Sequence, residues 1–576
     1  MIEQEFQLLS EIKANPGSRD ALRNAACKQL SEKGWITPDG FLSDAGEEAL
    51  EPYRVDNAII MAAGVSSRFI PLSYEIPKGL LLVKGEVLIE RMIRQLQEKG
   101  IGEIHVIVGY MQDKFLYLKD KFGVTIHVNK EYAAKNNPSS LMLVTEHLKN
   151  SYILCSDLYY TRNVFSPYVY DSYYAMKMFY GEANEYAYKT DKNKRIISIS
   201  APCKNELILA AEAYFSGKFS GQFKRILCEE YAAPGVAEQI WEVILQRHLD
   251  DLAIHEKIYT DDVVYEFDKL EELRVFDPSY LNNIGSPIFE HICSVLQCVE
   301  KDIVNIEPIK TGLTNQTFKF TINGKPYLYR HPGAGTAGFL NRRCEQFAEE
   351  HARRLGIDST YIYMDPDSGW KVSEFVDGCA DLDIARPADL QRALSVLRKL
   401  HDAAIPCRWE FEPLEQARLF IEDMHARGQR NKADFADTHE KIVSLYALVS
   451  RNERKRVLSH NDAWSYNFLA TGKNIQLIDW EYSGNNDPLA DLASFLTNVP
   501  YSYAQAADVL KTYLNRQYTD EELTQFIGYN CIISYYWYIW AVWKSTLGHD
   551  VGDVLPLWHE KTRVCREEAM ALYQGK

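Results

Sequence analysis

Apolar runs alternate with amphipathic stretches from Asn57 to Tyr160, and this alternation allows only a few folds. The segments follow one another as AIIMAAG, IERMIRQLQEKG, EIHVIVGY, VTIHVN, LMLVTEHL and YILCSDLYY. Apolar runs of about four to eight residues with amphipathic helices between them are typical of a parallel sheet that is covered by helices on both faces. The sequence therefore predicts a doubly wound α/β domain in this region.

The segments that follow indicate further domains. YYAMKMFY and EYAYKT lead through Asp191-Lys-Asn-Lys to RIISIS, which is typical of a hairpin, and VVYEFDKLEELRVFD closes the first large domain near residue 277. A second strand-rich stretch, IEPIKTGLTNQTFKFTINGKPYLYRHPG, precedes a mostly helical region. Because 576 residues are too many for one hydrophobic core, we predict domains at 1–55, 56–285 and 300–576.

Residues 1–55 predict helices followed by a short hairpin. Ser18 can cap SRDALRNAACKQLSEKG, Gly34 can end that helix, and Pro38-Asp39-Gly40 can form a turn. This pattern resembles a winged-helix module. The segment carries ten acidic and six basic residues, whereas a DNA-binding surface needs an excess of positive charge. We therefore expect a structural or protein-contact role, and no nucleic-acid partner.

The overall composition is acidic, with 64 basic and 80 acidic residues and a net charge of −16. Such a surface repels phosphate groups, so a nucleotide site needs local positive charge. The absence of a long uncharged apolar run or a signal-like N-terminus predicts a cytoplasmic protein without a membrane partner. Eleven cysteines without a Cys-x-x-Cys pair favour reduced thiols. The sequence leaves the oligomeric state open.

A small-residue loop directly after the first apolar run is a candidate phosphate site. Backbone N–H groups of such a loop can surround phosphate oxygens, and Arg68 at its end and Lys78 behind Pro77 add positive charge. An ordinary turn between a strand and a helix is the alternative for the loop alone. The loop residues that we predict to bind nucleotide are Ala62, Ala63, Gly64, Ser66, Ser67 and Arg68, together with Lys78.

AAGVSSRF, PKGLLLV, NNPSSL and LCSDLYY resemble, in this order, the sugar-nucleotide and CTP:phosphocholine nucleotidyltransferase superfamily, which has a Rossmann-like fold. Ser66 stands where that family often has glycine. The resemblance implies that Asn137, Ser139 and Ser140 contact the nucleotide and that Lys78 and Arg68 assist catalysis. It further implies that Asp157 and Asp268 bind Mg²⁺, with Asp261 and Asp262 as rivals of Asp268.

A second phosphate site is predicted in VLSHNDAWSYNFLATGKNIQLIDWEY. Asp462 and Asn467 share one loop, and the apolar run IQLID ends in Asp479. These spacings match eukaryotic-type kinases, in which the loop Asp accepts the proton of a substrate hydroxyl while the Asn and the later Asp bind Mg²⁺. A surface loop of capping residues is the alternative. The sequence therefore predicts a kinase-like bilobal domain with Asp462 as catalytic residue.

The segments before this loop fit the same prediction. A glycine-containing turn between strands could cover phosphates, Arg330 takes the place of the usual nucleotide-binding lysine, and a helical glutamate could pair with it. WKVSEFVDG is typical of a hinge strand whose backbone meets the nucleotide base. The predicted nucleotide-binding residues are Gly312, Asn315, Arg330, Glu345 and Glu374, with Glu349 as the alternative to Glu345.

IDWEYSGNNDP and YYWYIWAVW resemble the choline/ethanolamine kinase family over roughly residues 300–576. The resemblance implies that Glu481, Tyr482, Trp537 and Trp540 enclose a quaternary ammonium group. A trimethylammonium group has no N–H to donate, so aromatic faces and a carboxylate recognise it best. The alternative is that Trp537 and Trp540, three residues apart, lie on one face of a buried helix and only pack the core.

The two resemblances together imply one bifunctional enzyme. A choline kinase makes the phosphate monoester that a phosphocholine cytidylyltransferase uses, so the expected substrates are choline, ATP, phosphocholine and CTP, with Mg²⁺ as cofactor. The CDP-choline formed would serve phosphocholine decoration of a cell-surface glycan or lipid. One alternative is a sugar-1-phosphate nucleotidyltransferase fused to an aminoglycoside-like kinase, and another is a DNA-binding regulator that senses choline metabolites.

Overall fold

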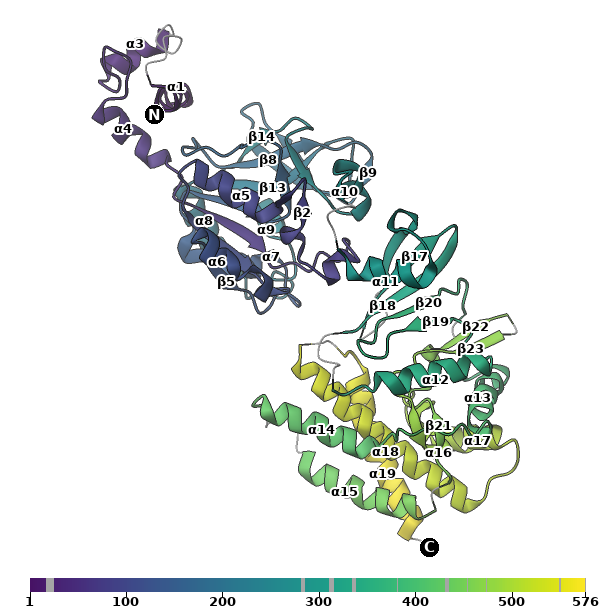
Figure 1. Cartoon of the computed structure of the whole chain (residues 1–576). Helices are drawn as coiled ribbons and strands as arrows, with labels where there is room; N and C mark the ends of the chain where they lie inside the picture. Colours follow the sequence, from purple (N-terminus) through teal and green to yellow (C-terminus); the bar gives the residue numbers. More distant parts are fainter. Residues whose placement is uncertain are drawn as a thin grey trace. The chain divides into compact units, whose positions relative to one another are not determined.

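The computed structural model describes residues 1–16, 25–280, 285–309, 315–333, 338–380, 382–429, 435–452, 454–472, 474–548 and 551–574. The chain divides into two units, residues 1–288 and 289–576 (Figure 1). No helix within these described ranges is both long and apolar enough to cross a membrane.

The N-terminal segment packs its apolar side chains into a small core of its own. Its helices are α1 (Glu3–Ala14), α3 (Ala25–Glu32) and α4 (Asp44–Leu50). Phe6 and Leu9 on α1 pack with Leu30 on α3 and against Tyr170 of the following domain. The hairpin predicted at Pro38-Asp39-Gly40 is a single bridge between Ile36 and Leu42. Ser18, the predicted cap, lies outside the described residues, and the winged helix stays a prediction.

The first large domain is built on a nine-stranded sheet in the order β11-β10-β13-β6-β1-β4-β5, with β8 paired to β13 and to β14. Strands β6, β1, β4 and β5 are parallel, as predicted, whereas β13 is antiparallel to β6. The strands are β1 (Asn57–Ala62), β4 (Glu103–Val108), β5 (Thr125–Val128), β6 (Ser151–Cys155), β8 (Tyr173–Met178), β10 (Ala187–Thr190), β11 (Ile196–Ser200), β13 (Leu207–Phe215) and β14 (His255–Ile258).

Helices cover both faces of this sheet because alternate residues of each strand point to opposite sides. On β1, Ala58 and Ile60 pack with Met92 of α5 in one core cluster, while Ile59 packs with Phe223 of α8 in another. The other elements of the domain are α6, α7, α9, α10, β7 and β15. The bounds are α5 (Leu88–Glu98), α6 (Tyr117–Phe122), α7 (Asn137–Met142), α8 (Gly217–Glu230), α9 (Trp241–Arg247), α10 (Leu270–Phe276), β7 (Leu158–Tyr160) and β15 (Val264–Glu266).

Two-stranded sheets and the helix α11 complete the first part of the chain. The remaining short pairs are β2 (Leu82–Val83) with β3 (Glu86–Val87) and β9 (Glu182–Ala183) with β12 (Cys203–Lys204). Helix α11 (Pro287–Leu296) spans the boundary between the two units.

The second unit has an antiparallel sheet in the order β16-β17-β18-β20-β19, followed by a mostly helical lobe. The strands are β16 (Val304–Ile309), β17 (Gln316–Ile322), β18 (Lys325–His331), β19 (Tyr361–Met364) and β20 (Lys371–Glu374). The helices are α12 (Arg342–Arg354), α13 (Pro387–Asp402), α14 (Pro413–Ala426), α15 (Phe435–Val449), α16 (Pro488–Ser494), α17 (Tyr503–Leu514), α18 (Asp520–Thr546) and α19 (Val554–Gln574).

Two short antiparallel strand pairs in the helical lobe hold the predicted kinase loop. They are β21 (Val457–Ser459) with β24 (Gly484–Asn486) and β22 (Phe468–Thr471) with β23 (Asn474–Leu477). The loop from His460 to Asn467 connects β21 with β22, so both of its ends are held by strands. Helix α18, which contains YNCIISYYWYIWAVW, is buried along most of its length.

Candidate active sites

The small-residue loop after β1 lines a cavity of about 480 Å³ at the carboxyl end of the parallel strands. This is the edge at which ligands bind in open α/β sheets. Of the residues predicted for this site, the cavity is lined by Ala62, Ala63, Gly64, Ser66, Lys78, Asn137, Ser140 and Asp157. Ser67, Arg68, Ser139 and Asp268 lie outside this lining set.

Lys78 and Asp157 form a largely buried ion pair in the cavity. Lys78 Nζ lies 2.7 Å from Asp157 Oδ2, with the two side chains 7% and 19% exposed. Burial acts to lower the pKa of Lys78, but the charges of Asp157 and Glu266 raise it above its ordinary value. Gly79, next to Lys78, allows the backbone to lie close to Ser156, next to Asp157, because a Cβ at Gly79 would lie 2.6 Å from Ser156 Oγ. The pair therefore places a fixed positive charge beside a carboxylate that could hold a cation.

Arg68 and Asp268 form a second ion pair, with 3.1 Å between Arg68 Nη1 and Asp268 Oδ2. The rivals Asp261 and Asp262 are exposed. Sequence analysis missed Glu266, which pairs with Leu158 across β15 and β7, next to Asp157. Burial, and then the charge of Asp157, raise the pKa of Glu266 to about 7. Its position as an acidic residue inside the apolar run VVYEF is the sequence feature that could have indicated Glu266 as a site residue.

The NNPSSL segment is held by its own side chains. Asn137 Oδ1 accepts a hydrogen bond from Trp241 N at 2.7 Å, and Ser139 Oγ donates to Asn136 O at 2.7 Å. Asn129, which was not predicted, donates from Nδ2 to Ser139 Oγ at 2.8 Å and to Ser140 Oγ at 3.1 Å. Asn129 also lines the cavity, so the end of β5 and the start of α7 form one wall.

Ser66 has a left-handed backbone, with φ of +52°. A residue with a Cβ loses about 1–2 kcal/mol in that conformation, whereas the neighbouring Ser67 lies outside this region. Ser66→Gly should therefore be more stable than the matched Ser67→Gly variant by about 1–2 kcal/mol, or by several degrees in melting temperature. Calorimetry of the full chain measures the difference, and identical melting of the two variants would contradict it.

In the second unit, the structure brings Asp462, Asn467 and Asp479 together. Asn467 Nδ2 donates to Asp462 O at 2.8 Å and to Asp462 Oδ2 at 3.2 Å, and Ile478 N donates to Asn467 O at 2.9 Å. The last bond places Asn467 beside Asp479, whose φ is +70°. Burial, and then the charges of Asp479 and Glu481, raise the pKa of Asp462 well above its ordinary range.

Asp491 on α16, which sequence analysis missed, holds the backbone of this loop. Its Oδ2 accepts hydrogen bonds from His460 N at 2.8 Å and pairs with His401 Nε2 at 2.8 Å, while its Oδ1 accepts from Asn461 N at 2.6 Å. Asp491 is fully buried. Buried charge-assisted bonds of this kind hold the loop in one conformation.

Arg330 pairs with Glu345 rather than with the alternative Glu349. Arg330 Nη1 lies 2.5 Å from Glu345 Oε1, and Glu349 pairs with Lys371 at 2.6 Å. Although burial opposes its charged form, Arg330, Arg342 and Lys371 lower the pKa of Glu345 to about 2. Both Arg330 and Glu345 therefore stay charged.

The other predicted nucleotide-binding residues have different surroundings. Asn315 Nδ2 donates to Glu481 Oε2 at 2.9 Å, so this residue reaches the predicted substrate carboxylate. Glu374 is half-buried, pairs with Lys325, and donates its backbone N–H to Thr360 O at 2.8 Å. Its place at the hinge stays a prediction, and Gly312 lies outside the described residues.

Tyr482, Trp537 and Trp540 form a buried aromatic cluster with Trp558. Trp537 lies 5.0 Å from Tyr482 and 5.6 Å from Trp540 between ring centroids, in edge-to-face contacts. Each of these rings is at most 6% exposed. Trp537 Nε1 is buried without a hydrogen-bond partner in the part of the chain that the structure describes. Buried tryptophan N–H groups usually find such a partner.

Carboxylates and a lysine border this cluster. Glu481 is buried beside Tyr482, and burial, then the charge of Asp479, raise its pKa to about 7. Lys544 was not predicted: its Nζ lies 5.6 Å from the Trp540 centroid and 5.3 Å from the Trp543 centroid. Burial lowers the pKa of Lys544, and the charge of Glu481 opposes this. The chain thus already places one cation against these ring faces.

Both sites offer the oxygen ligands that Mg²⁺ prefers. In the second unit, both hydrogen bonds of Asn467 use Nδ2, which leaves Oδ1 for a cation beside the partly exposed carboxylate of Asp479. In the first unit, Asp157 and Asp268 supply carboxylates next to Glu266. Burial raises the pKa of Asp462 and Glu266, and neighbouring negative charges raise it further. A divalent cation would offset those charges.

Two protein families match separate parts of the chain. The family described as choline/ethanolamine kinase matches residues 306–533, and the MobA-like NTP transferase domain matches residues 58–161. Choline-phosphate cytidylyltransferase from Streptococcus pneumoniae is 31% identical over 217 residues, which are 38% of this chain and 95% of that protein. 2-Aminoethylphosphonate cytidylyltransferase from Lancefieldella rimae is 29% identical over 229 residues, 39% of this chain and 93% of that protein.

A solved structure of the choline kinase LicA from Streptococcus pneumoniae is 25% identical and covers 49% of this chain and 98% of its own, with a TM-score of 0.42. The two family matches and the cytidylyltransferase relative show that the protein is a transferase with a nucleotidyltransferase domain and a kinase domain. The chain belongs to the same nucleotidyltransferase family as the choline-phosphate cytidylyltransferase from Streptococcus pneumoniae, of which it covers 95%, and its residues 306–533 match the choline/ethanolamine kinase family. Enzymes of both kinds generally use Mg²⁺.

Proposed function

We propose that the chain phosphorylates choline with ATP and then couples the phosphocholine formed to CTP, releasing CDP-choline and pyrophosphate. The observation that carries this proposal is the conjunction of a choline/ethanolamine kinase domain with a domain whose relative is a choline-phosphate cytidylyltransferase. The product of the first reaction is the substrate named for that relative. Either domain alone would leave its substrate much less defined.

In the kinase reaction, the choline hydroxyl oxygen attacks the γ-phosphorus of ATP, and the bond from that phosphorus to the β–γ bridging oxygen breaks. Asp462 orients the hydroxyl and accepts its proton. Arg330, held by Glu345, neutralises phosphate charge, while Glu481, Tyr482 and Trp537 receive the trimethylammonium group. Mg²⁺ bound at Asn467 and Asp479 would supply further neutralisation of phosphate charge.

In the cytidylyl transfer, a phosphate oxygen of phosphocholine attacks the α-phosphorus of CTP and pyrophosphate departs. Lys78 and Arg68 neutralise the charge that builds up on the phosphate oxygens, and the loop from Ala62 to Ser67 surrounds them. Mg²⁺ bound at Asp157 and Asp268 would bring the two anions together.

A second candidate substrate comes from the relative that acts on 2-aminoethylphosphonate. A phosphonate already carries phosphorus bonded to carbon, so its activation needs no kinase. The kinase domain in the same chain therefore favours a phosphate monoester. Ethanolamine phosphate fits this argument as well as phosphocholine does, and the aromatic cluster favours the quaternary ammonium.

Mass spectrometry of the products tests the proposal. The full chain is incubated with ATP, CTP and Mg²⁺ and with choline, ethanolamine or 2-aminoethylphosphonate, and each component is omitted in turn. From choline, CDP-choline should form only when ATP, CTP and Mg²⁺ are all present, whereas supplied phosphocholine should need CTP and Mg²⁺ but no ATP. Formation of a cytidylyl phosphonate, with no phosphorylation of choline, would overturn the proposal.

The aromatic cluster gives a test of substrate choice. Trp537→Leu should raise the KM for choline by about 2–30-fold, because a cation–π contact contributes about 0.5–2 kcal/mol, and Trp537→Phe should raise it less. The control substrate is 3,3-dimethylbutan-1-ol, an uncharged isostere of choline, whose KM should change equally little in both variants. Equal changes for both substrates would mean that Trp537 only packs the core.

A further inference from the structure

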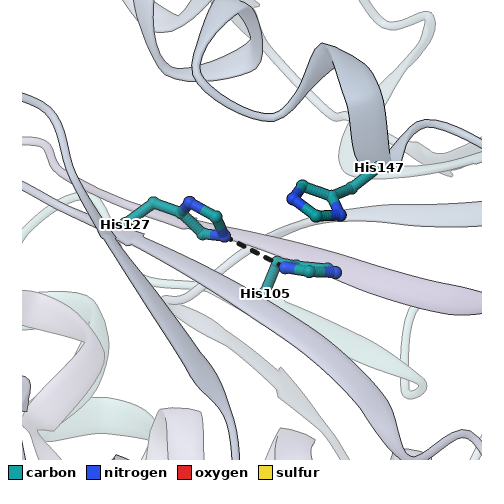
Figure 2. Close-up of side chains that lie close together, drawn as sticks. All are labelled: His105, His127 and His147. Carbon is teal, nitrogen blue, oxygen red and sulfur yellow. Dashed lines mark hydrogen bonds between the residues drawn. The ribbon is translucent and has the colours of Figure 1, made fainter.

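Three histidines meet on the face of the first sheet that α7, α8 and α9 cover. His105 lies on β4, His127 on the neighbouring β5, and His147 in the 3-10 turn Thr145–His147 after α7. In the parallel register His105 is opposite Thr125, so His105 and His127 lie on the same side of the sheet. Figure 2 shows the three rings gathered around one point.

The spacing of these rings suits a metal ion. One ring nitrogen from each histidine lies within 4.8 Å of the others, and His105 Nδ1 lies 3.0 Å from His127 Nε2. Imidazole nitrogens bound to Zn²⁺ at about 2.0–2.1 Å in tetrahedral geometry are about 3.3 Å apart. Small side-chain rotations would therefore bring all three nitrogens to bonding distance.

A carboxylate orients the central ring of the cluster. His105 Nε2 lies 3.1 Å from Glu103 Oε1, and Glu103 is itself held by Asn57 Nδ2 at 3.3 Å and by Lys149 Nζ at 3.4 Å. If His105 donates its Nε2–H to Glu103, its Nδ1 keeps a lone pair that faces the other histidines. Histidine ligands of metal ions are commonly oriented by a carboxylate in this manner.

We propose that His105, His127 and His147 bind one Zn²⁺ ion, separate from the Mg²⁺ of either active site. Three imidazoles are a donor set that Zn²⁺ accepts readily and Mg²⁺ does not. The ion would join β4, β5 and the turn after α7, and a water molecule could fill the fourth position.

The position of the site relates it to the nucleotide cavity. His127 is two residues before Asn129, which holds Ser139 and Ser140 and lines that cavity. His147 follows α7, which carries the same two serines. Bound Zn²⁺ would therefore fix the two segments that form this wall of the cavity, and its role would be structural.

Zinc titration of the full chain tests the proposal. The protein is prepared without a histidine tag, stripped with a chelator, and titrated against a chromophoric chelator in excess Mg²⁺, which occupies the active-site carboxylates. One Zn²⁺ should bind per chain. His147→Gln, at a half-buried position, should weaken binding by more than about 100-fold, and Glu103→Gln by about 10–100-fold.

The matched control is His248→Gln. His248 also pairs with a carboxylate, Glu230, in the same unit, so this variant should bind Zn²⁺ like the unaltered chain. A measurement without any variant is protection of His105, His127 and His147 from diethyl pyrocarbonate by Zn²⁺, read by peptide mass spectrometry. Absence of a Zn²⁺ equivalent in the unaltered chain, equal binding by the His147→Gln variant, or no protection of the three histidines would each overturn the proposal.

Discussion

Asp462→Asn should lower the rate of choline phosphorylation by about 10²–10⁴-fold, because a positioned proton acceptor contributes about this much. The asparagine keeps the shape of the side chain and can still accept the hydrogen bond from Asn467 Nδ2. It also removes a partly buried carboxylate whose pKa is raised by burial and by Asp479 and Glu481. The variant should therefore fold at least as stably as the unaltered chain while losing its kinase activity.

The measurement is phosphocholine formation from choline and ATP, followed at saturating substrate, together with CDP-choline formation from supplied phosphocholine and CTP. The second rate should be unchanged in the Asp462→Asn variant. Asp367→Asn, at an exposed aspartate of the same unit, is the matched control and should leave both rates unchanged. Loss of both activities in the Asp462→Asn variant would argue against two independent sites.

Asp157→Asn should have the opposite effect, lowering CDP-choline formation by about 10²–10³-fold, the cost of removing one electrostatic group from such a site. The substitution removes a carboxylate proposed to hold Mg²⁺ and breaks the largely buried pair with Lys78. Lys78 would keep Glu266 and Asp268 as neighbouring charges. Phosphocholine formation by the kinase domain should be unchanged.

The control for this variant is Asp261→Asn, because Asp261 is a nearby but exposed aspartate that sequence analysis placed as a rival for the metal. Calorimetry of the Asp157→Asn variant separates a local loss of stability from a loss of catalysis. An Asp157→Asn variant with unchanged cytidylyl transfer, or an Asp261→Asn variant that loses it, would show that the carboxylates were assigned wrongly.

Lys78 and Asp157 could be predicted to lie close together because both follow predicted elements at one edge of a parallel sheet. In the structure Lys78 Nζ lies 2.7 Å from Asp157 Oδ2. Sequence analysis did not find β13, which lies between β6 and β8 and makes the sheet mixed. This strand contains Glu212, fully buried and bound by Tyr173 and Tyr259. A charge inside a strand is stabilised by residues remote in sequence, so the local pattern hides it.

Separation along the sequence also explains which residues of the second unit were not predicted. Asp462, Asn467 and Asp479 lie in one continuous segment, so their spacing could be recognised. Asp491 acts through backbone N–H groups of a loop about 30 residues earlier, which no spacing rule anticipates. Lys544 reaches its rings because α18 is buried on all sides, and the amphipathic pattern that normally indicates a helix face is missing there.

The position of Arg342 has one further consequence. Its Nη1 lies 2.8 Å from Glu345, the partner of Arg330, and 3.5 Å from Glu481, which Asn315 also contacts. A shift of α12 on ATP binding would therefore move Arg342 relative to Glu481 and change the electrostatic environment of the proposed choline site. Thermodynamic reciprocity then requires that the alcohol change the affinity for ATP by the same factor, so the two substrates should bind cooperatively.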